Sequence, residues 1–172
     1  MNEPLDNLTV SNADALPESL RTVVRRWWAT LDARRGDRAG LRRASTPSAV
    51  AFLPAYHALL REFRTAGVPV NPDSAAVMAG VLAHVETDDG SRSFAEQMAS
   101  KHNDKARVSG LRFRRILAVD GLADLQTSLI RMIHLLDKTA SVGDLADSIR
   151  WWNDRTKKRW ASDYYRTAPN ED

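Results

Sequence analysis

The sequence predicts an all-α fold, a helical bundle built as one domain or as two small helical lobes. Its 172 residues are 43% hydrophobic, which is enough to bury a substantial core. Apolar residues recur at spacings of three and four in every long segment, and no segment shows the alternation typical of a strand. We expect four parts, a flexible acidic arm, an N-terminal lobe, a C-terminal lobe and an acidic tail, at residues 1–17, 18–100, 101–166 and 167–172.

Capping signals place the helices of the N-terminal lobe. Pro17 suits the first turn of a helix, and Thr46 and Asn71 each precede a proline, the pattern of an N-cap followed by the first helical residue. Ser93 and Glu96 have the spacing of a capping box. We therefore expect helices at residues 18–32, 47–52, 54–66, 72–85 and 93–100, with a basic loop at 34–43 and a polar loop at 87–92.

The C-terminal lobe is expected to contain a basic loop at 101–108 and three helices. The first runs from Ser109 to about Asp120 and ends at Gly121. The second has an apolar face of Leu122, Leu125, Leu129, Met132, Ile133 and Leu136, broadened by Ile130 and Leu135. The third is one long helix capped by Ser141, with an apolar stripe of Leu145, Ile149, Trp152, Trp160 and Tyr164 and with Thr156 at the missing step.

Charge is distributed unevenly along the chain. The formal net charge is only +3, but residues 1–20 hold four acidic side chains and no basic one, and the last two residues are acidic. This leaves 25 basic against 16 acidic residues on 21–166, a formal charge of +9. A basic body between acidic ends indicates a polyanionic partner such as nucleic acid.

Sequence motifs for catalysis or for binding a metal ion are absent. The chain has no Cys, its four His residues lack the spacing of a zinc helix, and no phosphate-binding or nucleophile-elbow motif occurs. Glu86–Gly90 departs from a calcium loop in the position of its glycine and has Gln97 where the last acid belongs. We expect no catalytic residue, metal ion or cofactor. With no basic, apolar leader and no apolar stretch longer than nine residues, the chain is expected in the cytoplasm and not in a membrane.

Basic residues form three clusters in the second half of the chain. Lys101, Lys105 and Arg107 share a loop, Arg112 and Arg115 share a helix face beside Arg114, and Arg155 and Lys158 lie near Trp151. An indole beside cations can stack on an unpaired base while the cations hold phosphates. Solvated helix faces and a core tryptophan are the simpler interpretation of each cluster alone.

Four stretches in order along the chain carry a family resemblance: Trp28–Asp32 with Leu41–Pro47, Leu53–Tyr56, Ser109–Leu117, and Ile149–Trp152 with Arg155 and Trp160–Tyr165. In residue types and spacing they resemble the CasB family, the small subunit of the type I-E CRISPR surveillance complex called Cascade. The resemblance covers about residues 20–166. By position, it implies nucleic-acid contacts by Arg43, Arg115, Arg131 and Arg155.

The resemblance implies a non-catalytic helical protein present in two copies, arranged head to tail. Its partners would be the backbone and large subunits of Cascade, the guide RNA complex and the target DNA. Its basic surface would hold the displaced strand of the R-loop. We expect nucleic acid to be bound by Arg42, Arg43, Lys101, Lys105, Arg107, Arg112, Arg115, Arg131, Arg155 and Lys158.

Two other functions remain open from the sequence. One is an all-α regulator that binds duplex DNA, although no short helix–turn–helix pair shows a polar recognition helix. The other is a structural adaptor whose basic face meets an acidic protein surface. A regulator would prefer one duplex, and an adaptor would keep its nucleic-acid affinity when the basic clusters are neutralised.

Overall fold

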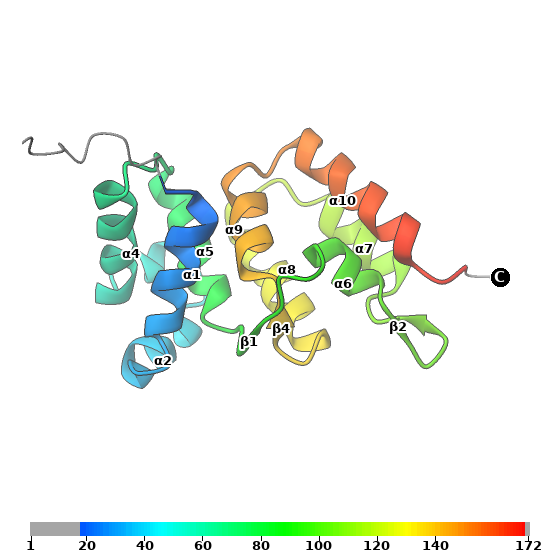
Figure 1. Ribbon diagram of the computed structural model, residues 1–172, viewed down its shortest axis with the longest axis horizontal. Coiled ribbons are helices and arrows are strands. Elements are labelled where there is room, and N and C mark those ends of the chain that lie inside the picture. The colour runs from blue at the N-terminus through cyan, green and yellow to red at the C-terminus, as the bar shows by residue number, and fades with distance from the viewer. Residues whose placement is uncertain (1–17, 171–172) are drawn as a thin grey trace, which may run out of the picture.

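The computed structural model describes residues 18–170 and confirms a mostly helical fold (Figure 1). Its helices are α1 (Leu20–Thr30), α2 (Arg35–Arg43), α3 (Pro47–Val50), α4 (Pro54–Thr65), α5 (Pro72–Leu82), α6 (Phe94–Ala99), α7 (Gly110–Leu117), α8 (Leu122–Leu135), α9 (Val142–Arg150) and α10 (Asp154–Thr167). The predicted acidic arm at 1–17 and the acidic residues Glu171 and Asp172 lie outside the described residues.

Four strands of two residues each join segments of this described region. β1 (Thr87–Asp88) pairs in parallel with β4 (Thr139–Ala140), and β2 (Lys101–His102) pairs antiparallel with β3 (Lys105–Ala106). The β1–β4 pair ties the segment after α5 to the segment between α8 and α9.

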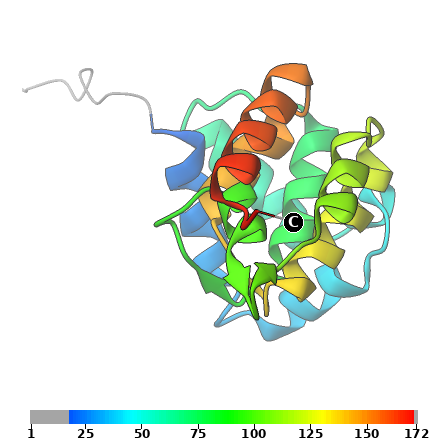
Figure 2. The ribbon, with the colours of Figure 1, turned by 90° about the vertical axis from the view of Figure 1, so that its right-hand side faces the viewer.

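Helix α5 lies at the centre of the fold because it is apolar on all sides. Every residue from Ser74 to Leu82 is buried, and the helix packs against α3, α4, α8 and α9. Helix α1 packs on α9 and α4, and it buries Leu20, Val23, Val24 and Trp27. Helix α6 packs on α10, on the opposite side of α9 from α4 (Figures 1 and 2). The division into lobes at residue 100 stays a prediction.

The predicted caps begin their helices as expected. The side chains of Thr46 and Asn71 accept hydrogen bonds from the first turns of α3 and α5. Ser93 and Glu96 form the capping box of α6. The side chains of Ser109 and Ser141 cap α7 and α9 by accepting hydrogen bonds from the amides of Arg112 and Asp144. These local signals therefore set the starts of half of the described helices.

The two basic loops are more regular than predicted. Residues 35–43 form helix α2, in which Asp37 lies in the first turn and Arg42 and Arg43 in the last, as the helix dipole favours. Its Leu41 is buried, and this anchor stabilises the helix although the segment contains Gly36 and Gly40, which disfavour helix. Residues 101–108 contain the β2–β3 hairpin, with positive φ angles at its turn residues Asn103 and Asp104.

The predicted single long helix after Ser141 is wrong. The chain leaves α9 at Trp151, and Asn153 caps the new helix α10 by accepting a hydrogen bond from the Thr156 amide. The apolar stripe continues across the break, since Thr156, Trp160 and Tyr164 are all buried. The stripe therefore concealed a cap that the Asn-Asp pair at 153–154 encodes.

Candidate nucleic-acid interface

The structure distributes the ten predicted residues over four places. Arg42 and Arg43 end α2, Lys101 and Lys105 lie on the hairpin with Arg107 just beyond it, and Arg155 and Lys158 lie on α10. Arg112, Arg115 and Arg131 come together between α7 and α8. Arg112 and Arg115, from one predicted cluster, share this cavity with Arg131, which the family resemblance implied. Arg42 and Arg43 line a different cavity of about 740 Å³.

The cavity between α7 and α8, here called the α7–α8 groove, has a volume of about 440 Å³. Helix α7 buries Phe113 and Ile116, which turns Arg112 and Arg115, three residues apart, toward solvent. Helix α8 contributes Arg131 at the same cavity. The apolar floor includes Ile116, Met132 and Leu135, and Leu135 remains 37% exposed instead of joining the core as its helix position suggested.

The three groove arginines are not neutralised by neighbouring acids. No Asp or Glu within residues 18–170 forms an ion pair with Arg112, Arg115 or Arg131. By contrast, Arg42 pairs with Glu86 at 3.3 Å and Lys101 with Asp104 at 2.9 Å. The groove therefore presents three guanidinium groups that are free to bind an anion.

Two histidines and Arg42 connect the groove with the end of α2. His134 lines the groove, and its ring lies 5.5 Å from the ring of His84. Beyond it, Arg42 donates from Nε to the carbonyl oxygen of Ala83 at 2.8 Å. Burial, and then the electrostatic influence of His134, Arg42 and Lys138, lower the pKa of His84 to about 4. His84 is therefore neutral near pH 7, chiefly because its imidazole is buried.

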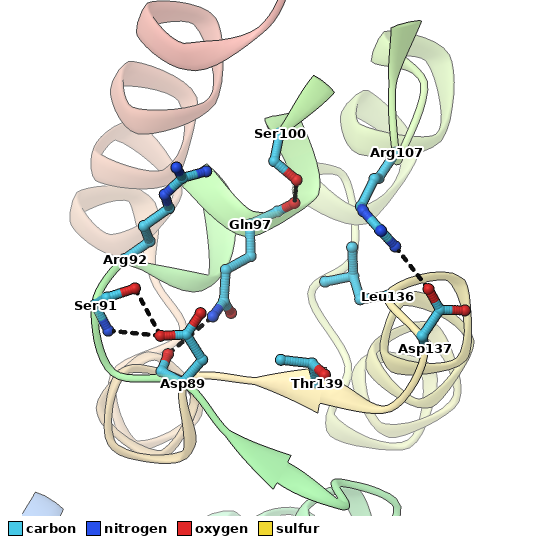
Figure 3. A pocket seen from close by; sticks show the side chains of 9 residues that line it. All are labelled: Asp89, Ser91, Arg92, Gln97, Ser100, Arg107, Leu136, Asp137 and Thr139. Atoms are coloured by element: carbon cyan, nitrogen blue, oxygen red, sulfur yellow. Dashed lines mark hydrogen bonds and ion pairs between the residues drawn. The ribbon is translucent and has the colours of Figure 1, made fainter. Parts of the chain in front are cut away.

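Arg107 is committed to a different contact. It lines a cavity of about 320 Å³, where its Nη1 atom bonds to the Asp137 carboxylate at 2.9 Å (Figure 3). Nearby, Gln97 donates from Nε2 to the carbonyl oxygen of Asp89 at 2.9 Å. Of the predicted loop cluster, only Lys105 has no acidic partner within the described part of the chain.

The α9–α10 connection brings Trp151 and Arg155 to a second cavity, here called the Trp151 pocket. It has a volume of about 500 Å³ and is also lined by Arg21, Asp147 and Arg159. Trp151 is 59% exposed, so it is not the core tryptophan that the simpler interpretation required. Lys158 faces a separate, shallower cavity and does not join this pocket.

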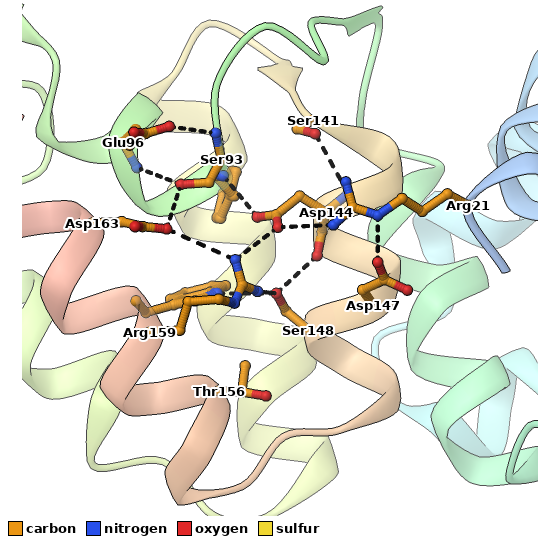
Figure 4. Close-up of polar contacts among 12 residues, drawn as sticks. Arg21, Ser93, Glu96, Ser141, Asp144, Asp147, Ser148, Thr156, Arg159 and Asp163 are labelled. Carbon is orange, nitrogen blue, oxygen red and sulfur yellow. Dashed lines mark hydrogen bonds and ion pairs between the residues drawn. The ribbon is translucent and has the colours of Figure 1, made fainter. Parts of the chain in front are cut away.

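A buried carboxylate that the sequence did not single out holds this end together. Asp144, whose side chain is 3% exposed, accepts hydrogen bonds from the Phe94 amide at 2.8 Å and from Arg159 Nη1 at 2.9 Å (Figure 4). Arg21 Nη2 lies 3.5 Å from the same carboxylate. Asp144 thereby links α9 to α1, α6 and α10. The sequence signalled it only as the third residue after the Ser141 cap.

The described residues offer neither a metal-ion site nor a membrane-spanning helix. Among residues 18–170, no three His, Asp or Glu side chains gather closely enough to hold a metal ion. None of the helices in this range has the length and apolar character needed to cross a bilayer.

Comparison with known proteins identifies the family. No curated protein sequence matches the chain. Among solved structures, the fold matches a chain in the crystal structure of E. coli Cascade bound to a PAM-containing double-stranded DNA target, with a TM-score of 0.70 and 21% sequence identity over 87% of this chain and 97% of that chain. The family of the CRISPR-associated protein Cse2 matches residues 37–165, three quarters of the sequence. This confirms the resemblance found in the sequence: the protein belongs to the Cse2 family of CRISPR-associated proteins, also called CasB.

Proposed function

We propose that this protein is a non-catalytic small subunit of a type I-E Cascade complex and stabilises the R-loop by holding the displaced DNA strand. Its partners would be the backbone and large subunits, the guide RNA complex, and a second copy arranged head to tail. The observation that carries the proposal is the α7–α8 groove, with three guanidinium groups that no acid of the described residues pairs.

Small free-energy contributions from protein contacts are sufficient to stabilise an R-loop. An R-loop exchanges a DNA duplex for a heteroduplex of similar stability, so protein contacts to the backbone decide the balance. A groove that binds the displaced strand removes it from re-annealing. Arginine is suited to this task because its planar guanidinium contacts phosphate oxygens in pairs. The apolar floor adds a surface for bases without reading their sequence.

The test is the lifetime of the R-loop in reconstituted complex. Arg115→Glu with Arg131→Glu should leave assembly intact and shorten the lifetime roughly tenfold, equivalent to about 1.4 kcal/mol. The matched control reverses the charge of two other exposed arginines that do not line the α7–α8 groove, in the double variant Arg61→Glu with Arg114→Glu.

Arg114 lies on the same helix as Arg115, so the control separates the groove from general charge. An unchanged lifetime in assembled Arg115/Arg131 complex, or equal shortening by both pairs, would contradict the proposal. Tight binding of the isolated protein to one particular duplex would instead favour a regulator.

A further inference from the structure

The α9–α10 connection presents an aromatic ring to solvent. Trp151 is 59% exposed, whereas the other four tryptophans are buried or partly buried. The helix break separates the neighbours, because Trp152 turns inward, packs on Trp160 at 5.0 Å and donates from Nε1 to the Val119 carbonyl oxygen at 2.7 Å. Packing of the apolar core therefore accounts for Trp152 but leaves Trp151 without a role.

The exposed indole is held in place. The Arg150 guanidinium lies 4.9 Å from the centre of the Trp151 ring and donates to the Pro69 carbonyl oxygen at 2.6 Å. The Trp151 carbonyl oxygen accepts a hydrogen bond from the Thr156 hydroxyl. One side of the ring thus faces a fixed cation, and little side-chain entropy would be lost when a ligand meets the rest of its surface.

The charges around the indole leave one guanidinium free. In the Trp151 pocket, Arg21 is bound to Asp147 and Arg159 to Asp144. Arg155 is exposed and has no acidic partner within residues 18–170. A flat aromatic surface next to an unneutralised guanidinium matches the two parts of a nucleotide, since a base stacks on the ring while the cation binds its phosphate.

We propose that the Trp151 pocket is a stacking subsite for one unpaired base of a DNA strand, with Arg155 bound to the adjacent phosphate. The ligand rests on the proposed function, which supplies a displaced strand. The subsite is separate from the α7–α8 groove. Trp152 bonds to Val119, just before α8 begins, whereas Arg131 and His134 lie near the end of that helix.

The experiment compares two strands that have the same phosphates but differ in their bases. Fluorescence anisotropy measures binding of the full-length protein to a labelled oligothymidine and to an abasic strand of equal length at one salt concentration. Trp151→Ala should weaken oligothymidine binding roughly 5- to 150-fold, the range for losing one stacking aromatic, and change abasic binding less than about twofold.

Three control variants separate stacking from charge and from folding. Trp151→Phe keeps a ring and should stay near wild type. Tyr165→Ala removes a different exposed aromatic side chain, on α10, and should leave the binding of both strands unchanged. Arg155→Gln should weaken the binding of both strands by the same factor, because both strands retain the phosphate that Arg155 would contact.

The outcomes decide the subsite independently of the groove. Equal losses on both strands in Trp151→Ala, or no loss on either, would overturn it and favour a protein partner at this ring. Wild-type protein that does not prefer oligothymidine over the abasic strand, or binds neither, also overturns it. The groove proposal is decided separately by the R-loop lifetime in the assembled complex.

Discussion

Replacing Asp144 by asparagine tests how strongly one buried carboxylate joins four helices. Both oxygens act as acceptors, one for the Phe94 amide and the other for Arg159. An amide of the same shape offers only one oxygen, so its NH2 group must face one of these donors. An unsatisfied buried donor costs about 1–3 kcal/mol. Arg159 and Arg21, with side chains 39% and 52% exposed, add about 0–1 kcal/mol for the lost charge. We expect Asp144→Asn to lower the free energy of unfolding by about 1–4 kcal/mol.

Urea denaturation followed by far-UV circular dichroism measures this difference. The matched control is Asp104→Asn, which removes the ion pair between Asp104 and Lys101. The side chains of these two residues are 91% and 64% exposed, respectively. Asparagine also tolerates the positive φ of position 104. The control should cost less than about 1 kcal/mol. If Asp144→Asn unfolds within about 0.5 kcal/mol of wild type at an unchanged m-value, the network does not hold the helices as described.

Three other predictions follow from the groove, the α5 packing and the buried histidine. Changing all three groove arginines to glutamine should reduce the slope of log affinity against log salt for single-stranded DNA by about 2, whereas Arg114→Gln should change it less than about 0.3. Gly80→Ala places a Cβ atom 2.9 Å from Gln126 Nε2 and 3.0 Å from a Val50 methyl group. It should lower the free energy of unfolding, measured by urea denaturation, by about 1–3 kcal/mol. An unchanged free energy would show that α8 moves away freely. Because the pKa of His84 falls from 6.5 to about 4 on folding, the unfolded chain binds the extra proton, so stability should decline as pH falls from 6.5 to 4. His84→Gln should flatten that part of the urea-midpoint profile, and a profile identical to wild type would contradict the assignment.

The sequence predicted those parts of the fold that depend on neighbouring residues. Thr46, Asn71 and Ser93 predict the starts of helices because a capping side chain binds amides two or three positions away. Helix α2 could not be predicted from local signals, since its stability depends on Leu41 entering a core made by other helices. The break at 151–153 was hidden because the apolar stripe resumes in register on α10.

The candidate site was predictable in its residue types but not in its assembly. Arg112 and Arg115 share a face by helical spacing alone. Their meeting with Arg131 depends on how α7 packs on α8, which no local pattern specifies. Likewise, the pairing of Arg107 with Asp137 joins residues 30 positions apart and removes a predicted contact residue from the free cations.

The central position of α5 also has a consequence during synthesis. Its apolar surface is covered by α8 and α9, and α9 ends 68 residues after α5. At translation rates of about 5–20 residues per second, that length takes roughly 3 to 14 s to emerge. Until then, the faces of α5 that α3 and α4 do not cover stay exposed, and exposed apolar surface binds chaperones and promotes aggregation. The completion of α9 is therefore the event that completes the burial of α5.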